Sequence, residues 1–443
     1  MTPRNTLILV FLVMACSADK AGDSTSVSPT VTNTLTNTAT SPTPTSPITS
    51  EEDCSGEAYS DAWLCKSWLV NVTGETSAVM RDEAGGPHLV NVLSVTVTSD
   101  GGSDYARVQA TGIPSYSRTL TAEDVAALHD RANASTDFVT GETVVAEGDR
   151  IEFGQDVGYF SDPDCVEGEG YGYWPPGPTC PSNTDVAAHF PLVQEPSAKD
   201  CATGGGTIGL WLNGVAVFNW GDTFSWDNAG VWENVAPLLE IFDMGICDGH
   251  AAGDTYHHHS YPSCLADQLG DDDSGHSPIF GFAADGYPIA GPWFAAAEAA
   301  QSCWVQRDYD DPDDPTGCGG TGQRRCLMID QLQPDLGTET TASPGPSTSE
   351  QVTSLSGNVF DASEGLYYQD YYFDADCEAE GGASLDSHNG HEHDDWGYHY
   401  HITSTFPFIV GPTFYGRIHD NAITGCGGGE HEPPPPGSSA GPR

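Results

Sequence analysis

The stretch Thr207-Ile-Gly-Leu-Trp-Leu-Asn-Gly-Val-Ala-Val-Phe-Asn219 predicts the kind of fold most directly. Asn213-Gly214 at its centre is the strongest short signal for a tight β-hairpin turn. Towards the N-terminus, residues 90–99 alternate β-branched and polar side chains, which is the pattern of a half-buried strand. Residues 106–112 continue in the same way. The sequence therefore predicts a series of strands.

Helical patterns are scarce by comparison. Residues 121–130 form the clearest helix, because Thr121 and Asp124 have the spacing of a capping box. A short helix is also expected over residues 295–301, after Pro292. With 51 glycines and 31 prolines, the composition favours short strands joined by structured loops. We predict a mostly β fold: a single large, disulfide-braced, β-sandwich-like domain with long loops and few short helices.

The first fifteen residues have the features of a lipoprotein signal peptide. Arg4 is followed by an apolar run at residues 7–14, far shorter than the ~20 residues of a permanent membrane helix. The run ends in Val13-Met-Ala-Cys16, which resembles a bacterial lipobox, so Cys16 would be acylated and would anchor the protein in a membrane. Because Ser17 rather than Asp follows, the resemblance favours the outer membrane, facing the periplasm or the surface. An ordinary cleaved signal peptide is the alternative.

Composition divides the rest of the chain. Residues 16–53 are rich in Ser, Thr and Pro, and such a segment cannot bury enough apolar surface to fold, so we expect a disordered tether. Residues 428–443 are Pro-rich and are expected to be a second disordered end. Residues 54–427 remain for the β domain.

Cysteine usage is typical of an exported protein. Of the 13 cysteines, all but Cys16 are free to form disulfides. None has the C-x-x-C spacing of a zinc ribbon or a redox motif, so structural bridges are the better interpretation. The sequence does not fix the connectivity, but close neighbours are plausible pairs: Cys54/Cys65, Cys165/Cys180, Cys247/Cys264 and Cys318/Cys326.

Acidic residues dominate the charge, with 64 Asp and Glu against 14 Lys and Arg and a formal net charge of −50. This excess argues against nucleic acid and anionic lipid headgroups as electrostatic partners, because both require a basic patch. Calcium could bind the acidic runs at residues 271–273 and 308–314. Neither run has the glycine and glutamate positions of an EF-hand loop, so solvated acidic loops are the plainer interpretation.

Most of the fifteen histidines are concentrated in three segments. The first runs from Gly249-His250 to Tyr256-His-His-His259, the second contains Gly275-His276-Ser-Pro278, and the third ends in Tyr398-His-Tyr-His401. The first and third segments echo each other, although we find no internal repeat of fixed period.

Tyr398-His399-Tyr400-His401 resembles the element for which the YHYH domain family is named. The resemblance covers residues 90–416 and implies no particular reaction. One departure is that the first copy reads Tyr-His-His-His, which puts His258 in place of a tyrosine. Cognate elements follow in the order of the family: Asn213-Gly214-Val215, Gly249-His250, Tyr256 to His259, Gly275-His276-Ser277-Pro278, Asp285-Gly286-Tyr287-Pro288 and Asn389-Gly390-His391.

Alternate side chains of a strand share a face, so His257 is expected to lie with His259, and His399 with His401. Two such strands facing each other would bring four imidazoles to one point, and zinc or copper accepts such ligands. Further residues are candidates for completing this site: as ligands His250, His276 and His391, and as carboxylates that orient the histidines Asp254, Asp285, Glu392, Asp394 and Asp395.

We therefore predict a lipid-anchored, extracytoplasmic protein that binds zinc or copper through a histidine cluster. Two alternatives stay open. A metal with an open coordination position could activate water, as in a metal-dependent hydrolase or oxidase, although no H-E-x-x-H, G-x-S-x-G or P-loop motif is present. In a metal-free structural or adhesive module, the histidines would instead hydrogen-bond to buried backbone.

Overall fold

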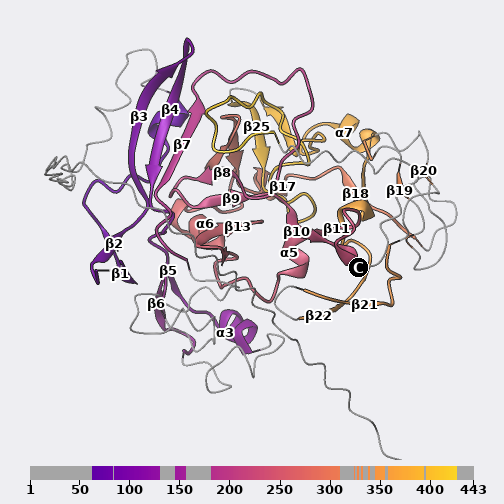
Figure 1. The fold of residues 1–443 in the computed structure, drawn as a ribbon, viewed down its shortest axis with the longest axis horizontal. Helices are drawn as coiled ribbons and strands as arrows, with labels where there is room; N and C mark the ends of the chain where they lie inside the picture. The colour runs from indigo at the N-terminus through magenta and orange to yellow at the C-terminus, as the bar shows by residue number, and fades with distance from the viewer. Residues whose placement is uncertain are drawn as a thin grey trace, which may run out of the picture. The chain divides into compact units, whose positions relative to one another are not determined.

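The computed structural model shows mostly strands and a few short helices, as predicted (Figure 1). All the residues that it describes belong to one compact unit, residues 46–443. In this part of the chain, no helix combines the length and the apolar character needed to cross a bilayer. The predicted signal peptide, tether and tail lie outside the described residues. These are residues 62–82, 84–129, 145–155, 181–309, 324, 327–328, 331–332, 338–339, 345–354, 358–393 and 396–426.

An eight-stranded sheet carries the histidine segments, with the order β12-β13-β9-β8-β14-β15-β25-β24. β8 and β9 form the hairpin predicted at Asn213-Gly214, where Gly214 has a φ of 79°. β14 and β15 form a second hairpin at Asp285-Gly286. Pairing is antiparallel except between β9 and β13 and between β15 and β25. The strands are β8 (Thr207–Trp211), β9 (Ala216–Phe218), β12 (His250–Ala252), β13 (Thr255–His258), β14 (Ile279–Ala283), β15 (Pro288–Ala290), β24 (Gly390–His393) and β25 (Gly397–His401).

A three-stranded antiparallel sheet covers the middle of one face of the large sheet. It consists of β3 (Val92–Asp100), β4 (Ser103–Ala110) and β7 (Val186–Pro191), so the strands predicted at residues 90–99 and 106–112 are confirmed. Its apolar side chains share a core with Leu210 and Phe282 of the large sheet. The result is a layered, sandwich-like arrangement of two sheets.

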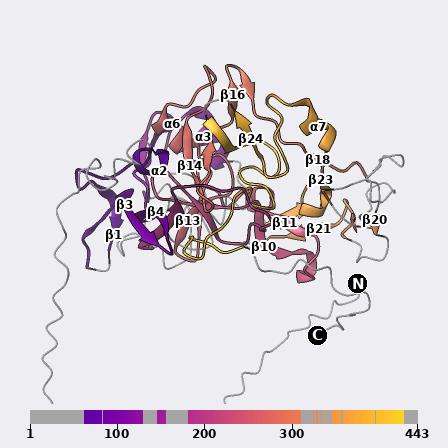
Figure 2. The same ribbon diagram turned by 90° about the horizontal axis from the view of Figure 1, so that it is seen from above.

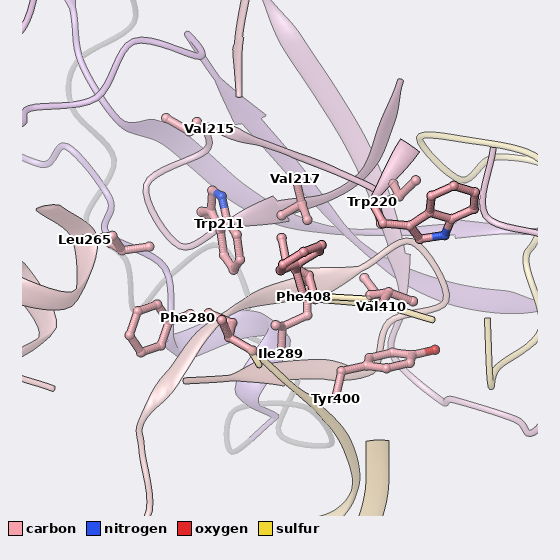
Figure 3. Packing of buried hydrophobic residues seen from close by; sticks show 14 of the residues in the cluster. Trp211, Val215, Val217, Trp220, Leu265, Phe280, Ile289, Tyr400, Phe408 and Val410 are labelled. Atoms are coloured by element: carbon pink, nitrogen blue, oxygen red, sulfur yellow. The ribbon is translucent and has the colours of Figure 1, made fainter. Parts of the chain in front are cut away.

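A larger apolar core covers the opposite face of the eight-stranded sheet (Figure 3). Trp211, Phe280 and Ile289 of the sheet contact the C-terminal segment there, which contributes Phe408 and Val410. These side chains are at most 7 % exposed, and each large buried side chain contributes roughly 1.5–3 kcal/mol by leaving water. The central sheet is therefore covered on both faces.

Shorter elements surround the two sheets (Figure 2). Two-stranded sheets pair β1 (Thr76–Arg81) with β2 (Pro87–Leu89), β5 (Ser117–Thr119) with β6 (Arg150–Glu152), β10 (Gly221–Ser225) with β11 (Glu233–Val235), β16 (Trp293–Ala295) with β17 (Glu298–Ala299), β18 (Trp304–Gln306) with β23 (Tyr371–Phe373), β19 (Leu327–Met328) with β20 (Thr338–Glu339), and β21 (Gln351–Thr353) with β22 (Val359–Asp361). The helices are α2 (Trp63–Lys66), α3 (Ala122–His129), α5 (Ala236–Leu239), α6 (Ser263–Leu269) and α7 (Ala375–Glu380), with 3₁₀ turns at Trp226–Asn228 and Tyr368–Asp370.

One of the two predicted helices forms and the other does not. α3 has the predicted capping box, in which the Asp124 amide donates to Thr121 Oγ1 at 3.1 Å and the Thr121 amide donates to Asp124 Oδ2 at 2.8 Å. The helix predicted at residues 295–301 is wrong, because the β16–β17 hairpin turns there with Ala297 at a φ of 57°. An alanine run this short gains too few hydrogen bonds to offset the cost of starting a helix.

Three disulfides join described cysteines: Cys201–Cys426, Cys247–Cys264 and Cys303–Cys377. The predicted pair Cys247/Cys264 is confirmed. Cys65 is also disulfide-bonded. The other predicted pairs include cysteines outside the described residues, namely Cys54, Cys165, Cys180, Cys318 and Cys326.

Candidate metal centres

A single row of cross-strand neighbours spans the eight-stranded sheet and has histidines at both ends. Cross-strand neighbours project from the same face of a sheet, so all of these side chains share one face. The tyrosines of the motif, Tyr398 and Tyr400, point to the other face, where Tyr400 joins the core of Figure 3. In order across the sheet, the members of the row are His250, His257, Ala216, Leu210, Phe282, Pro288, His399 and His391. The parallel register of Ile289 with Tyr400 places Pro288 beside His399.

The histidines form two groups, not the single group that the sequence predicted. Four strands lie between β13 and β25, so these two strands are ~24 Å apart at ~4.8 Å per strand spacing. The prediction that His257 and His259 converge with His399 and His401 is therefore wrong. We call the two groups the four-histidine cluster (His276, His391, His399 and His401) and the three-histidine cluster (His250, His257 and His259).

The four-histidine cluster brings four ring nitrogens together, all within 4.8 Å of one another. His399 Nε2 lies 3.2 Å from His276 Nε2 and 3.3 Å from His391 Nε2. It also lies 3.2 Å from His401 Nε2. β24 and β25 contribute three of the rings, and His276 comes from the segment that precedes β14.

Main-chain carbonyls orient all four rings of this cluster. A carbonyl oxygen only accepts hydrogen bonds, so the Nδ1 atom next to it carries the single proton of the neutral ring. Each Nε2 then presents a lone pair to the others. The Nδ1 atoms of His276, His391, His399 and His401 lie 2.7, 3.3, 3.0 and 2.6 Å, respectively, from the carbonyl oxygens of Ser277, Gly382, Gly397 and Gly291.

Burial keeps these imidazoles neutral. His399 and His401 are buried, whereas His276 and His391 are partly exposed. Loss of solvation lowers the pKa of His399 to about 3 and that of His391 to about 4, and it also lowers the pKa values of His276 and His401. Neutral imidazole is the form that binds a metal ion. On the partly exposed side, the Trp396 ring lies 4.4 Å from that of His276, between ring centroids.

The three-histidine cluster has the same construction. The Nε2 atoms of His257 and His259 are 3.0 Å apart. His257 Nδ1 donates to the Thr255 carbonyl at 3.0 Å, and His259 Nδ1 donates to the Asn219 carbonyl at 2.5 Å. His250 is only 1 % exposed and makes no hydrogen bond through either ring nitrogen. Such a buried imidazole is a costly feature that requires an explanation.

Glu240 is a further member of this site that the sequence did not predict. Its Oε2 atom lies 3.4 Å from both His250 Nε2 and His259 Nε2, and it accepts no hydrogen bond. Burial, followed by the charges of Asp222 and Asp243, raises the pKa of Glu240 to about 8. Residues 238–242 read Leu-Leu-Glu-Ile-Phe, and a single acid in an apolar run was the available signal.

The carboxylates predicted to orient the histidines do not do so. Asp285 lies on the tyrosine side, where its Oδ2 accepts a hydrogen bond from the Tyr400 hydroxyl at 2.6 Å. Asp254 and Glu392 are exposed. Main-chain carbonyls accept from the Nδ1 atoms instead. Asp394 and Asp395 lie outside the described residues.

The acidic run at residues 271–273 is not among the groups of potential ligands in the described part of the chain. Asp271 accepts hydrogen bonds from the Ser277 and Tyr261 hydroxyls at 2.7 and 3.2 Å. Asp272 accepts one from the Ser274 amide at 3.0 Å. These contacts give the carboxylates a local structural role. Most of the second acidic run, residues 310–314, lies outside the described residues.

A family model described as "YHYH protein" matches residues 188–415. The matched region contains all eight strands of the large sheet and every member of the two histidine clusters. Comparisons with curated proteins and with solved structures gave no match.

Proposed function

The chain belongs to the YHYH protein family, and we propose that this member binds a transition metal ion at the four-histidine cluster. One observation carries the proposal: four Nε2 lone pairs face one another while every Nδ1 proton is donated to a carbonyl. A hydrogen bond between two such nitrogens would need a second proton on one ring. A bound cation satisfies all four acceptors at once.

The spacing of the nitrogens supports zinc. With Zn–N bonds of ~2.0–2.1 Å, a tetrahedral ion holds its nitrogen ligands ~3.3 Å apart. A square-planar Cu(II) ion with similar bonds would hold neighbouring nitrogens ~2.9 Å apart. The three separations from His399 Nε2, which are 3.2, 3.3 and 3.2 Å, are close to the tetrahedral value. Copper is the competing ion.

A closed ligand shell favours binding over catalysis. Four imidazoles complete a tetrahedral zinc ion and leave no position for a water molecule or a substrate, whereas catalytic zinc usually keeps one position open. A hydrolase or an oxidase is therefore less favoured than a protein that binds a metal ion or is stabilised by one. The metal-free structural module is also less favoured, because it needs a donor for each Nε2 atom.

The test is elemental analysis of the full chain, purified without a histidine tag or a metal column. Zinc is expected in the wild-type protein, and His399→Gln should lose one equivalent. His88→Gln is a matched control, because His88 lies on β2 outside both clusters. A bound ion also stabilises the folded state, by ~2.7 kcal/mol at a free concentration of 100 Kd. Wild-type protein that contains no metal after exposure to zinc and copper would refute the proposal.

We further propose that Cys16 carries a lipid that anchors the protein in the cell envelope, in the outer membrane. The lipobox-like sequence ending at Cys16 supports this location, as do the disulfides, which persist in oxidising compartments. Cys16→Ser should move the protein from the membrane fraction to the soluble fraction and abolish labelling by a fatty-acid probe. Ser17→Ala is the control that should keep both. Unchanged labelling of Cys16→Ser would end this proposal.

A further inference from the structure

The two halves of the eight-stranded sheet are built alike. In each half, a hairpin is followed along the chain by a second hairpin, and the last strands of the two hairpins pair in parallel: β8-β9 with β12-β13, and β14-β15 with β24-β25. The halves meet where β8 and β14 run antiparallel, with Leu210 opposite Phe282. A pseudo-two-fold axis therefore passes between these two residues, perpendicular to the sheet.

Contacts on the two sides of this axis correspond in detail. The Leu212 amide donates to the Phe280 carbonyl, and the Ala284 amide donates to the Ile208 carbonyl, both at 2.8 Å. A Cβ atom on Gly209 would lie 2.5 Å from the Phe282 carbonyl oxygen. A Cβ atom on Gly281 would lie 2.4 Å from the Leu210 carbonyl oxygen. Both positions therefore require glycine for the same reason.

The second hairpins also correspond. Gly249-His250 and Gly390-His391 begin them, each after a residue with positive φ, Asp248 at 59° and Asn389 at 68°. A Cβ atom on Gly249 would lie 2.6 Å from the Tyr256 hydroxyl, and one on Gly390 would lie 2.4 Å from the Tyr398 hydroxyl. The first Tyr-His pair of each copy therefore packs on its glycine in the same way.

The axis relates the two histidine clusters, including the main-chain carbonyls that accept hydrogen bonds from their rings. His257 and His399 each donate from Nδ1 to the carbonyl two residues earlier, both at 3.0 Å. His259 and His401 donate to the carbonyls of the residues that follow β9 and β15, at 2.5 and 2.6 Å. His250 and His391 occupy corresponding places, opposite His257 and His399, respectively. The three-histidine cluster is thus a second copy of three of the four rings of the other cluster.

We propose that the three-histidine cluster binds a second divalent transition metal ion, with Glu240 as the fourth ligand. The residue that corresponds to His276 in this half is Gly204, which has no side chain to offer. Glu240 fills that role, since its Oε2 atom lies 3.4 Å from both His250 and His259 and has no hydrogen bond. The inference rests on these contacts, and it holds whether or not the four-histidine cluster is occupied.

The two ions would differ in donor set and in accessibility. Three imidazoles and one carboxylate suit zinc, and a bound cation would displace the proton that Glu240 holds because of its raised pKa. The three rings are at most 3 % exposed, whereas His276 and His391 are partly exposed. A chelator should therefore remove the ion of the four-histidine cluster first and that of the three-histidine cluster more slowly.

The experiment counts zinc in the full, tag-free chain after loading and dialysis. Wild type should hold two ions, while His257→Gln and His399→Gln should each hold one and the double variant none. His88→Gln should keep both. A wild type with one ion that His257→Gln retains would overturn this inference and leave the proposed function intact. If His257→Gln instead loses the one ion and His399→Gln retains it, the proposed function is refuted and this inference stands.

Glu240→Gln tests the fourth ligand even where a histidine variant fails to fold. The amide has nearly the same size, and circular dichroism of the variant should match that of the wild type. In competition with a chelator, the affinity of the slowly released ion should fall at least ~10-fold, the range seen when groups that support a metal site are removed. The affinity of the other ion should stay unchanged. Equal affinities of wild type and Glu240→Gln would exclude Glu240 and overturn the proposal as stated.

Discussion

Asp285 and Asn213 occupy the same place at the turns of the two central hairpins, and only one of them can ionise. Their Oδ1 atoms accept hydrogen bonds from the amides of Tyr287 and Val215, respectively, both at 3.2 Å. Asp285 is fully buried and also accepts from the Tyr400 hydroxyl. Burial raises the pKa of this carboxyl to about 6 in spite of its hydrogen bonds. The charge of Asp285 therefore costs stability at neutral pH.

We predict that Asp285→Asn changes how stability depends on pH. Between pH 3.8 and about 6, the folded state holds the proton of Asp285 more tightly than the unfolded state does. The contribution of this group is therefore full below pH 3.8 and is lost as the pH rises through 6, by up to ~3 kcal/mol. The free energy of unfolding in urea, measured from pH 4 to 7, should fall less in Asp285→Asn than in the wild type.

Asp254→Asn is the control for this prediction, because Asp254 is exposed. Its curve should run parallel to that of the wild type. Subtracting the curves also removes the contribution of the buried histidines, which titrate in the same range. Parallel curves for Asp285→Asn and wild type would show that the carboxyl is not destabilised by burial.

At the scale of elements, the pairing of β24 with β25 decides whether three rings of the four-histidine cluster meet. Gly390 begins β24 and packs against Tyr398 and the backbone of β25. A Cβ atom there would lie 2.4 Å from the Tyr398 hydroxyl and 2.7 Å from the His399 carbonyl oxygen. The backbone cannot yield without moving β25, which carries His399 and His401.

Gly390→Ala should therefore lower both stability and zinc affinity. Overpacking of this kind costs ~1–3 kcal/mol. Urea unfolding and a chelator competition measure the two effects in one preparation. Gly205→Ala is the matched control, because a Cβ atom at Gly205 meets nothing within 4 Å. Equal losses in the two variants would mean that the loss comes from the alanine itself and not from the contact with β25.

The sequence predicted local features of this site well and its long-range arrangement badly. The Asn213-Gly214 turn and the pairing of His399 with His401 follow from turn chemistry and from the two-residue period of a strand. That period says which face a side chain takes, but not which strands become neighbours. β13 and β25 were therefore expected face to face, whereas they lie near opposite edges of one sheet. Glu240 was missed because it lies in the connection between the β8–β9 and β12–β13 hairpins, outside the histidine segments.

At the scale of the whole molecule, disulfides close loops of very different length. Cys201–Cys426 joins residues separated by 225 positions and ties the C-terminal segment to the chain just before β8. Cys247–Cys264 spans 17 positions and links the approach to β12 with α6. The long bridge escaped prediction because only close neighbours can be paired by inspection of a sequence.

Removing the long bridge should cost more than removing the short one. Loop-closure entropy predicts a loss of ~5 kcal/mol for the double variant Cys201→Ser/Cys426→Ser and ~3 kcal/mol for Cys247→Ser/Cys264→Ser. Thermal and urea unfolding of the two double variants, compared with wild type, give this order directly. If the short bridge proved the more costly one, local strain or packing would outweigh chain entropy in this fold.

The contacts across Leu210 and Phe282 have the form of an isologous interface, in which each partner offers the other the same surface. Between two separate identical chains, every ligand would have to appear twice, once in each copy. When both copies belong to one polypeptide, the two halves can carry different side chains. One half can then keep His276 while the other has Gly204 and recruits a carboxylate. Covalent linkage thus lets a single backbone geometry carry two chemically different sets of candidate ligands.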